Sequence, residues 1–278
     1  MAGTDDAKPD ASHTGTRLSA ASVDITRHTK DGCTQATDQL AVEAPLEIRI
    51  EGRPVAVTMR TPGHDLELAA GFLLTEGVID GPDDIQALAH IDDPSDPHGN
   101  TVDTVLASGV PAARRHAADR STFASSSCGI CGKESIDRIV LSAPTLSSTL
   151  SIDASIMLEL PDTLRAAQAV FEQTGGLHAA ALFSSTGELE VLREDIGRHN
   201  AVDKVIGWRL HQDRMPVDDR VLLVSGRAGF EIVQKALMAG ISAVAAVGAP
   251  SSMAVALAEK SQMTLIGFLR DGRFNRYT

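Results

Sequence analysis

The second half of the chain alternates short apolar runs with longer stretches of helical periodicity, and no other feature restricts the fold as much. Strands that alternate with helices in this way are typical of an α/β layered domain with a largely parallel or mixed sheet. Gly175 and Gly176 close the first helix of the series, and Thr186 with Gly187 makes a turn between two strands. We therefore expect helices near residues 164–171, 198–208, 230–239 and 252–261, and strands near residues 178–184, 188–192, 220–224, 243–247 and 264–269.

The first half of the chain predicts a smaller lobe. Residues 46–50 and 55–59 alternate between apolar and polar side chains around a glycine turn, so we expect a β-hairpin. Thr61 and Pro62 have the character of a helix start, and apolar residues follow at helical spacing until Gly77, which suits a left-handed cap.

Composition divides the chain further. Residues 1–39 contain almost no large apolar side chains, so they cannot bury enough surface to offset the entropy of ordering. Residues 80–98 are acidic and hold three prolines, which is typical of a surface excursion before a strand near residues 101–107. We divide the chain into a disordered tail (1–39), an N-terminal lobe (40–120), a mobile cysteine-containing loop with its connection (121–155) and an α/β core (156–278).

Charge and cysteine content restrict the possible partners and compartment. The 278 residues include 25 basic and 37 acidic side chains, and the net charge of -12 argues against general nucleic-acid binding. No apolar run is long enough to span a membrane, and the N-terminus lacks the pattern of a signal peptide. Three cysteines, an odd and small number, fit a reducing compartment. We expect a cytoplasmic protein with no membrane contact.

Four polar segments follow predicted strands and favour an anionic ligand. They lie at residues 195–200, 225–229, 248–252 and 270–273, where loops leave the sheet. Ligands of α/β proteins tend to bind at the carboxyl ends of strands. Two of these loops lead into helices, whose first amides can hold an anion, and Arg198 or Arg227 could add bidentate phosphate contacts. Tight turns and solvated arginines would explain each loop alone, but the four together favour a nucleotide.

Cys128 and Cys131 stand two residues apart in a segment of serine and glycine. A structural zinc site would need two more ligands, such as His178 or His199. Zinc-dependent deamination is disfavoured, because Ala180 stands where a glutamate would be required after His178. A thioredoxin-like pair would sit at a strand-to-helix junction, which this segment does not resemble. A persulfide on a cysteine, which can accept and release sulfur, remains open beside the zinc alternative.

Six segments follow one another along the chain in a recognisable order, at residues 59–63, 71–77, 126–133, 174–180, 193–204 and 225–227. Together they resemble the formate dehydrogenase accessory sulfurtransferases, the FdhD family. The resemblance covers the chain from about Leu46 to the C-terminus and implies a body similar to the cytidine deaminase fold, with a three-layer α/β/α core and a smaller N-terminal lobe that contains a β-hairpin and a helix. It also implies homodimers.

The resemblance implies that the protein takes sulfur from a cysteine desulfurase and delivers it to the molybdenum bis(guanine dinucleotide) cofactor of formate dehydrogenase. The cofactor would be a substrate, and no zinc is expected. Cys128 matches the persulfide cysteine of the family and Cys131 its partner. The residues expected to bind the cofactor, including its guanine nucleotide ends, are Phe268, Leu269, Arg270, Asp271, Gly272, Arg273, Gly197, Arg198, His199, Asn200, Ser225, Gly226 and Arg227.

One alternative and one departure accompany this interpretation. The chain could be a chaperone that binds and delivers the molybdenum cofactor without covalent sulfur transfer, with the cysteines acting as a clamp. At Ala228-Gly229-Phe230 the sequence lacks the hydroxyl residue that many relatives have near the preceding arginine, so the contact of Arg227 with a ligand stays open.

Overall fold

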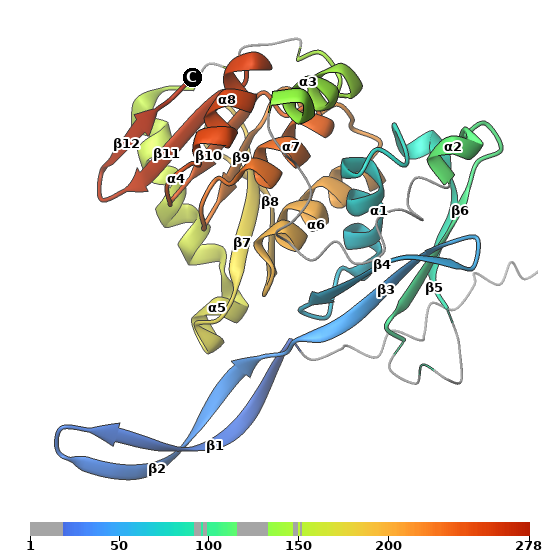
Figure 1. Ribbon diagram of the computed structural model, residues 1–278. Helices are drawn as coiled ribbons and strands as arrows, with labels where there is room; N and C mark the ends of the chain where they lie inside the picture. Colours follow the sequence, from blue (N-terminus) through green and yellow to red (C-terminus); the bar gives the residue numbers. More distant parts are fainter. Residues whose placement is uncertain (1–18, 92–95, 97–98, 116–132, 147–149, 151) are drawn as a thin grey trace, which may run out of the picture.

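The computed structural model describes residues 19–91, 96, 99–115, 133–146, 150 and 152–278. Three parts are visible in Figure 1: a core built on a six-stranded sheet, a smaller lobe built on a four-stranded sheet, and a two-stranded hairpin that projects from them. The predicted fold class, an α/β protein with a layered core and a smaller N-terminal lobe, is confirmed. Within the described residues, no helix combines the length and apolar character needed to cross a bilayer.

The projecting hairpin and the lobe come first in the chain. The hairpin consists of β1 (Ala20–Thr29) and β2 (Gly32–Ala41). The lobe contains β3 (Ala44–Ile50), β4 (Arg53–Arg60), α1 (Asp65–Thr75), the short 3-10 helix η1 (Pro82–Asp84), β5 (Ile85–His90), β6 (Thr101–Leu106) and α2 (Ala112–Arg115). Its sheet has the order β4-β3-β6-β5, so β4 and β5 are edge strands.

The core begins with α3 (Lys133–Ser142), α4 (Ala154–Ala167) and α5 (Ala169–Thr174). It continues with β7 (His178–Phe183), β8 (Leu189–Asp195), α6 (Arg198–His211), β9 (Val221–Val224), α7 (Phe230–Met238), β10 (Ala243–Ala246), α8 (Ser252–Lys260), β11 (Thr264–Arg270) and β12 (Arg273–Arg276). The sheet order is β12-β11-β10-β9-β7-β8. β9, β10 and β11 are parallel, and the other strands pair antiparallel, so the sheet is mixed as predicted.

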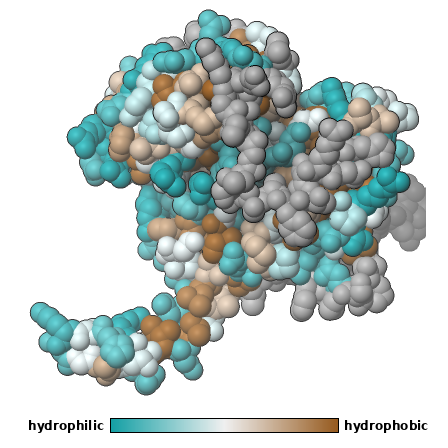
Figure 2. Space-filling view, viewed as in Figure 1, coloured by the Kyte–Doolittle hydropathy of each residue, from teal (hydrophilic) through white to brown (hydrophobic). Residues whose placement is uncertain are grey.

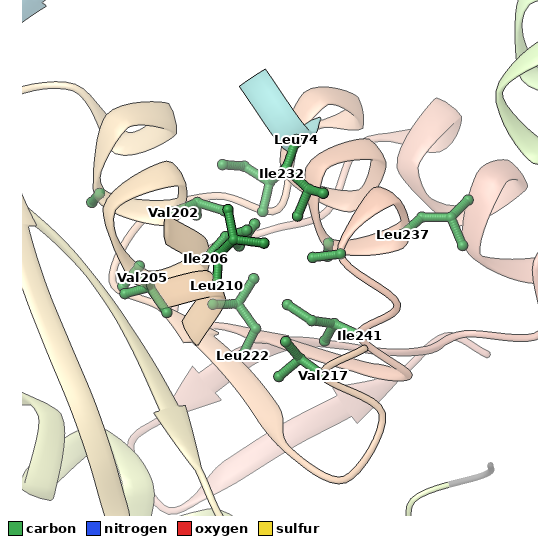
Figure 3. Close-up of a cluster of buried hydrophobic side chains, with 14 of the residues drawn as sticks. Leu74, Val202, Val205, Ile206, Leu210, Val217, Leu222, Ile232, Leu237 and Ile241 are labelled. Atoms are coloured by element: carbon green, nitrogen blue, oxygen red, sulfur yellow. The ribbon is translucent and has the colours of Figure 1, made fainter. Parts of the chain in front are cut away.

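Alternate residues of the central strands supply two separate apolar layers. In β9, Leu222 and Val224 pack with α6, α7 and α8, whereas Val221 and Leu223 pack with α4 on the opposite face. Figure 3 shows part of the first layer, in which Leu222 belongs to one cluster with Val202 and Ile206 of α6 and Ile232 of α7. Strands buried on both faces read as continuous apolar runs, which is why these segments were recognisable in the sequence. Each buried Leu, Ile or Val contributes about 1.5–3 kcal/mol.

Two glycines let the lobe approach the core closely. A Cβ atom on Gly71 of α1 would lie 1.9 Å from the carbonyl oxygen of Asp203 in α6. A Cβ atom on Gly207 of α6 would lie 1.8 Å from the carbonyl oxygen of Glu67 in α1. The two helix backbones are therefore in direct contact, and only glycine fits at either position. The lobe thus packs on the core through helix α1.

Several segments have regular structure that the sequence did not predict. Residues 20–39, expected to be disordered, form most of the β1–β2 hairpin, so that expectation is wrong for this part of the tail. β-Branched residues occur on each side of the Lys30-Asp31 turn, and they favour strands without many large apolar side chains. Residues 1–18 lie outside the described part. The others include η1 and β5 inside the acidic excursion, α2, α3 inside the connection, and β12 after the last predicted loop.

Candidate functional site

The central sheet brings the four polar loops to one edge. The parallel strands β9, β10 and β11 end there, and β8 ends there too because β7 runs antiparallel to both β8 and β9. The register pairs His178 at the start of β7 with Asp195 at the end of β8. Backbone hydrogen bonds join neighbouring loops, from Gly248 to the Gly226 carbonyl (2.9 Å) and from Phe268 to the Gly248 carbonyl (3.0 Å). The loops therefore lie together, where the carboxyl-end rule predicts ligand binding.

A pocket of about 650 Å³ opens at this edge. Three residues that the sequence assigned to ligand binding line it, namely Ser225, Arg270 and Asp271. Other polar lining groups include Arg165 and His178. This concave site combines apolar walls with a few polar and charged groups, as small-molecule pockets usually do.

Helices α4 and α5 and the segment that enters β7 complete the lining, and the sequence analysis did not assign them to the site. The guanidinium of Arg165 lies 4.5 Å from the ring centre of Phe171 and contacts the carboxylate of Glu172 at 2.9 Å. A signal was present in Gly175 and Gly176, which precede a strand. Because β7 is antiparallel to β9, the loop that enters β7 reaches the same edge as the loops that leave the parallel strands.

Ser225 supports the edge with both its backbone and its side chain. Its amide donates to the carbonyl of Ala179 (2.9 Å), and its hydroxyl accepts from the amide of Ala179 (2.9 Å). This exchange fixes the end of β9 against the start of β7. It also holds His178 near the Gly226 backbone, where a Cβ atom on Gly226 would lie 3.4 Å from the Nδ1 atom of His178.

The two histidines at this edge favour the neutral form. Burial lowers the pKa of His178, and the positive charge of Arg198 adds to this effect. Burial and neighbouring positive charges, Arg198 first among them, lower the pKa of His199 to about 4. The Nε2 atom of His199 lies 2.7 Å from a carboxylate oxygen of Glu231, without the geometry of a hydrogen bond. At neutral pH the cationic charge here therefore comes from arginines.

Four predicted arginines differ in exposure. Arg198 is half-buried at the start of α6. Arg227 in the loop after β9, Arg270 at the end of β11 and Arg273 at the start of β12 are exposed. The guanidinium of Arg270 lies 5.7 Å from the ring centre of Phe268 and 3.8 Å from Asp271. Exposed guanidinium groups beside a pocket suit phosphate recognition, because they keep their charge and their forked donors.

The predicted segment 268–273 comprises the end of β11, where the backbone is strained, and the tight turn into β12. Phe268 has a φ of 54°, a left-handed conformation that is costly for a bulky side chain, by about 1–3 kcal/mol. A register shift between β11 and β12 accompanies it. Asp271 (φ 54°) and Gly272 (φ 68°) then reverse the chain into β12. Such strain tends to concentrate at functional sites, and here it lies beside the pocket.

The segment 193–204 is mainly structural. The guanidinium of Arg193 donates to both carboxylate oxygens of Glu67 in α1 (2.6 and 2.7 Å). Glu194 accepts hydrogen bonds from the first amides of α5, those of Val170 (2.9 Å) and Phe171 (2.8 Å). Arg193 thus attaches the lobe to the core, and Glu194 holds helix α5, which lines the pocket.

Asp195 is the centre of a buried network between lobe and core. One carboxylate oxygen accepts from the amide of Thr61 (3.1 Å) and lies 2.7 Å from the amino group of Lys204. The other accepts from the amide of Gly197 (2.8 Å) and the side chain of Asn200 (3.0 Å). The side chains of Asp195, Asn200 and Lys204 are all buried. Gly197 and Asn200, predicted to bind the cofactor, therefore have a structural role at the lobe–core boundary.

A second buried cluster joins the same helices. Lys235 of α7 donates to Asp203 of α6 and to Thr75 of α1, each at 2.9 Å, and Thr75 donates to Asp203 at 2.8 Å. Burial alone would lower the pKa of Lys235, but the negative charges of Asp203 and Glu76 outweigh it and raise this pKa. The ammonium form is therefore the one that the cluster holds.

Cys128 and Cys131 lie outside the described residues. The described chain resumes with α3, two residues after Cys131. Among the described residues, no group of three or more His, Cys, Asp or Glu side chains is arranged to hold a metal ion.

Together, the fold and the site define an α/β protein with a pocket at the carboxyl edge of its sheet, lined in part by Arg165 and Arg270. The model of the FdhD/NarQ family matches residues 41–278, and the chain belongs to this family. The match begins at the last residue of β2, so most of the projecting hairpin lies outside it.

Relatives from distant organisms cover most of the chain. The sulfur carrier protein FdhD of Mycolicibacterium paratuberculosis is 50% identical over 247 residues, which are 87% of this chain and 90% of that protein. The protein of the same name from Sulfolobus acidocaldarius is 42% identical over 250 residues, covering 90% and 93%. A crystal structure from Desulfotalea psychrophila, described as a formate dehydrogenase accessory protein, has a TM-score of 0.74 at 24% identity and covers 94% of this chain and 97% of its own. This last likeness concerns the fold alone.

Proposed function

We propose that the protein is a sulfur carrier for formate dehydrogenase. It accepts sulfane sulfur from a cysteine desulfurase as a persulfide on Cys128, with Cys131 as the partner thiol. It then transfers the sulfur to the molybdenum bis(guanine dinucleotide) cofactor, which it binds as a substrate. It acts in the cytoplasm as a homodimer.

Family membership supports the sulfur chemistry. Relatives with 42–50% identity over most of this chain bear the name sulfur carrier protein FdhD. The chain has two closely spaced cysteines in its sequence, and Lys133 follows them by two positions. A neighbouring positive charge favours the thiolate, which is the form that attacks sulfane sulfur.

The observation that carries the cofactor part of the proposal is the pocket at the sheet edge. Its volume of about 650 Å³ suits a nucleotide-sized group, and Arg165, Arg270 and His178 line it. Helices α7 and α8 begin at the same edge, and their first amides favour negative charge. The guanine nucleotide ends of the substrate carry phosphates that suit these groups.

The proposed transfer conserves atoms and charge. The Cys128 thiolate attacks the outer sulfur of the desulfurase persulfide, a new S–S bond forms, and the desulfurase cysteine leaves as a thiolate. Delivery would break the S–S bond of the Cys128 persulfide, and both bonding electrons would return to Cys128 as the thiolate. The outer sulfur would then bond to the acceptor atom of the cofactor, which would supply the electron pair and be oxidised by two electrons. The role of the pocket is to hold the acceptor, because proximity replaces a bimolecular encounter.

Persulfide mass spectrometry tests the proposal. After incubation with a cysteine desulfurase and cysteine, the protein should gain one sulfur atom that a thiol reductant removes. Cys128→Ala should gain none and fail to activate formate dehydrogenase. The matched control is Cys33→Ala, which removes the exposed cysteine of the hairpin and should load normally. Loading and activation by Cys128→Ala would refute the assignment.

The chaperone alternative separates from this proposal in the double variant Cys128→Ala/Cys131→Ala. Calorimetric titration with guanosine diphosphate should give wild-type affinity, because the pocket is lined by residues outside the cysteine segment. Sulfur transfer should be lost. If nucleotide or cofactor binding is lost as well, the cysteines hold the cofactor, and the chaperone explanation is correct.

A further inference from the structure

The wall of the pocket that α4 and α5 form holds a buried polar side chain without an internal partner. Gln168 stands where α4 ends and α5 begins, and it is 4% exposed. Among the described polar residues that line the pocket, it is the one that is buried. Within the described part of the chain, no hydrogen bond reaches its side-chain amide. A buried amide without a partner is destabilising, so we expect a molecule in the pocket to satisfy it.

The backbone of Gln168 is tied to both helices. Its amide donates to the carbonyl of Arg165 (3.3 Å), and its carbonyl accepts from the amide of Glu172 (3.1 Å). Just after α5, a Cβ atom on Gly176 would lie 3.6 Å from the Cβ atom of Ala41 in the projecting hairpin. Figure 2 shows hydrophobic residues gathered near the base of this hairpin. Gln168 therefore belongs to a packed wall, which suits a residue that selects a ligand.

The two parts of the lining differ in charge. On the α4–α5 wall, Asp162 is exposed, and the charge of Arg165 is paired with Glu172 at 2.9 Å. The carboxyl end of α4 lies on this wall too, and Glu194 already occupies the first amides of α5. At the strand ends, Arg270 is exposed and lines the pocket. Phosphates therefore suit the strand ends, whereas a group with N–H donors suits the α4–α5 wall.

A guanine base matches this wall. Guanine carries an acceptor at O6 and N–H donors at N1 and N2, whereas adenine carries a donor at N6 and an acceptor at N1. A glutamine amide can donate to O6, and a carboxylate accepts from N1–H and N2–H. Phe171 lines the same wall, and aromatic rings provide stacking surfaces for bases. Adenine would set an acceptor against the carboxylate of Asp162 and lose these bonds.

We propose that Gln168 binds the base of the guanine nucleotide and that Asp162 selects guanine over adenine. The amide of Gln168 donates to O6 of the base, the carboxylate of Asp162 accepts from its N–H groups, and the phosphates extend towards Arg270. The amide of Gln168 is then satisfied when the nucleotide occupies the pocket. This inference rests on the proposed function, in which the cofactor carries guanine nucleotides, and it adds the residues that recognise the base.

Calorimetric titration of the full chain with guanosine diphosphate and with pyrophosphate tests the role of Gln168. Gln168→Met keeps the length of the side chain and removes the amide, so the dissociation constant for guanosine diphosphate should rise about tenfold or more. Affinity for pyrophosphate, which lacks a base, should stay unchanged. Urea unfolding should show no loss of stability, because the amide has no internal partner. The matched control is Gln173→Met, at an exposed position of α5 outside the pocket lining, which should bind both ligands like the wild type.

Asp162→Asn tests the same subsite at an exposed position, where buried packing is not disturbed. The wild type should bind guanosine diphosphate more tightly than adenosine diphosphate, by about a hundredfold or more. Asp162→Asn should reduce this preference about tenfold, because the amide of asparagine can face either base. Glu159→Gln removes an exposed charge of α4 outside the pocket lining and should keep the wild-type preference. Equal affinities of the wild type for the two nucleotides would contradict base selection by Asp162.

The base subsite and the proposed function fail in different ways in these titrations. A wild type that binds neither guanosine diphosphate nor pyrophosphate would refute the cofactor site of the proposed function, and the base subsite with it. If Gln168→Met weakens the binding of guanosine diphosphate no more than Gln173→Met does, the cofactor site stands and the assignment of Gln168 is overturned. Loss of affinity for both ligands in Gln168→Met would also overturn it, because the residue would then support the whole pocket instead of binding the base.

Discussion

The lobe–core boundary and the edge of the central sheet differ in how their charged side chains are used. At the boundary, Asp195 and Lys204 are buried and paired within a dense network. At the edge, Arg227 and Arg270 are exposed on loops beside a pocket. Charged side chains that form buried ion pairs stabilise the contact between lobe and core, whereas exposed arginines are available to bind a ligand.

The boundary should fail first when its central acid is neutralised. In Asp195→Asn the amino group of Lys204 stays buried without its counter-charge, and breaking a buried pair in this way costs about 3–5 kcal/mol. Urea unfolding, followed by the single tryptophan Trp208, measures the loss. Asp271→Asn at the exposed turn serves as the control, with a change within about 0.5 kcal/mol. Equal effects of the two variants would remove the distinction between boundary and edge.

The glycine contact between α1 and α6 should be nearly as sensitive. Gly207→Ala adds a methyl group 1.8 Å from the carbonyl oxygen of Glu67, so a helix must move. We expect a loss of about 3 kcal/mol, at the upper end of overpacking effects. Gly109→Ala is the control, since its Cβ would meet no atom within 4 Å. If Gly207→Ala unfolds at the wild-type urea concentration, the helices are not in the close contact described.

The ion pair between Glu67 and Arg193 should give the boundary a distinct pH dependence. Burial alone would raise the pKa of Glu67, but the hydrogen bonds from Arg193 and His64 outweigh it and lower this pKa to about 2. A carboxyl group with a lowered native pKa stabilises the fold fully above its unfolded pKa, near 4.5, and loses this contribution as the pH falls towards 2. The contribution is at most about 3 kcal/mol.

Glu67→Gln should therefore be less stable at pH 7 and should lose less stability than the wild type between pH 4.5 and 2. Glu188→Gln, at an exposed position, should follow the wild-type curve. Urea unfolding at several pH values makes the comparison. Parallel wild-type and Glu67→Gln curves would mean that Glu67 titrates normally in the folded protein.

The difference between the lobe–core boundary and the sheet edge also explains which features the sequence could and could not predict. Strands β9, β10 and β11 and their helices were recognisable because burial on both faces leaves a continuous apolar run. The convergence of the polar loops followed from the carboxyl-end rule. The sequence did not, however, show the structural contact of Asn200, whose side chain donates to the carbonyl of Met59, 141 residues away.

Two other differences between the sequence-based predictions and the structure also have physical reasons. The contribution of α5 to the pocket depends on the direction of β7, which periodicity does not specify. The β1–β2 hairpin was missed because its strands are stabilised by cross-strand polar pairs instead of by a core. Its low apolar content therefore predicted disorder. The regions that the sequence predicted best are those whose stability comes from local burial patterns.

The edge should respond to mutation in binding and hardly at all in stability. Arg270→Ala removes an exposed guanidinium that lines the pocket, so the free energy of unfolding should change by no more than about 0.5 kcal/mol. Affinity for guanosine diphosphate, measured by calorimetry, should fall about tenfold or more if the group meets a phosphate. The matched control is Arg276→Ala, which removes an exposed arginine from the same hairpin but outside the pocket lining. Equal loss of affinity in both variants would indicate a diffuse charge effect. Loss in Arg270→Ala alone, at unchanged stability, would locate the ligand at the strand ends. The ligand site would then be separate from the buried network that holds lobe and core together.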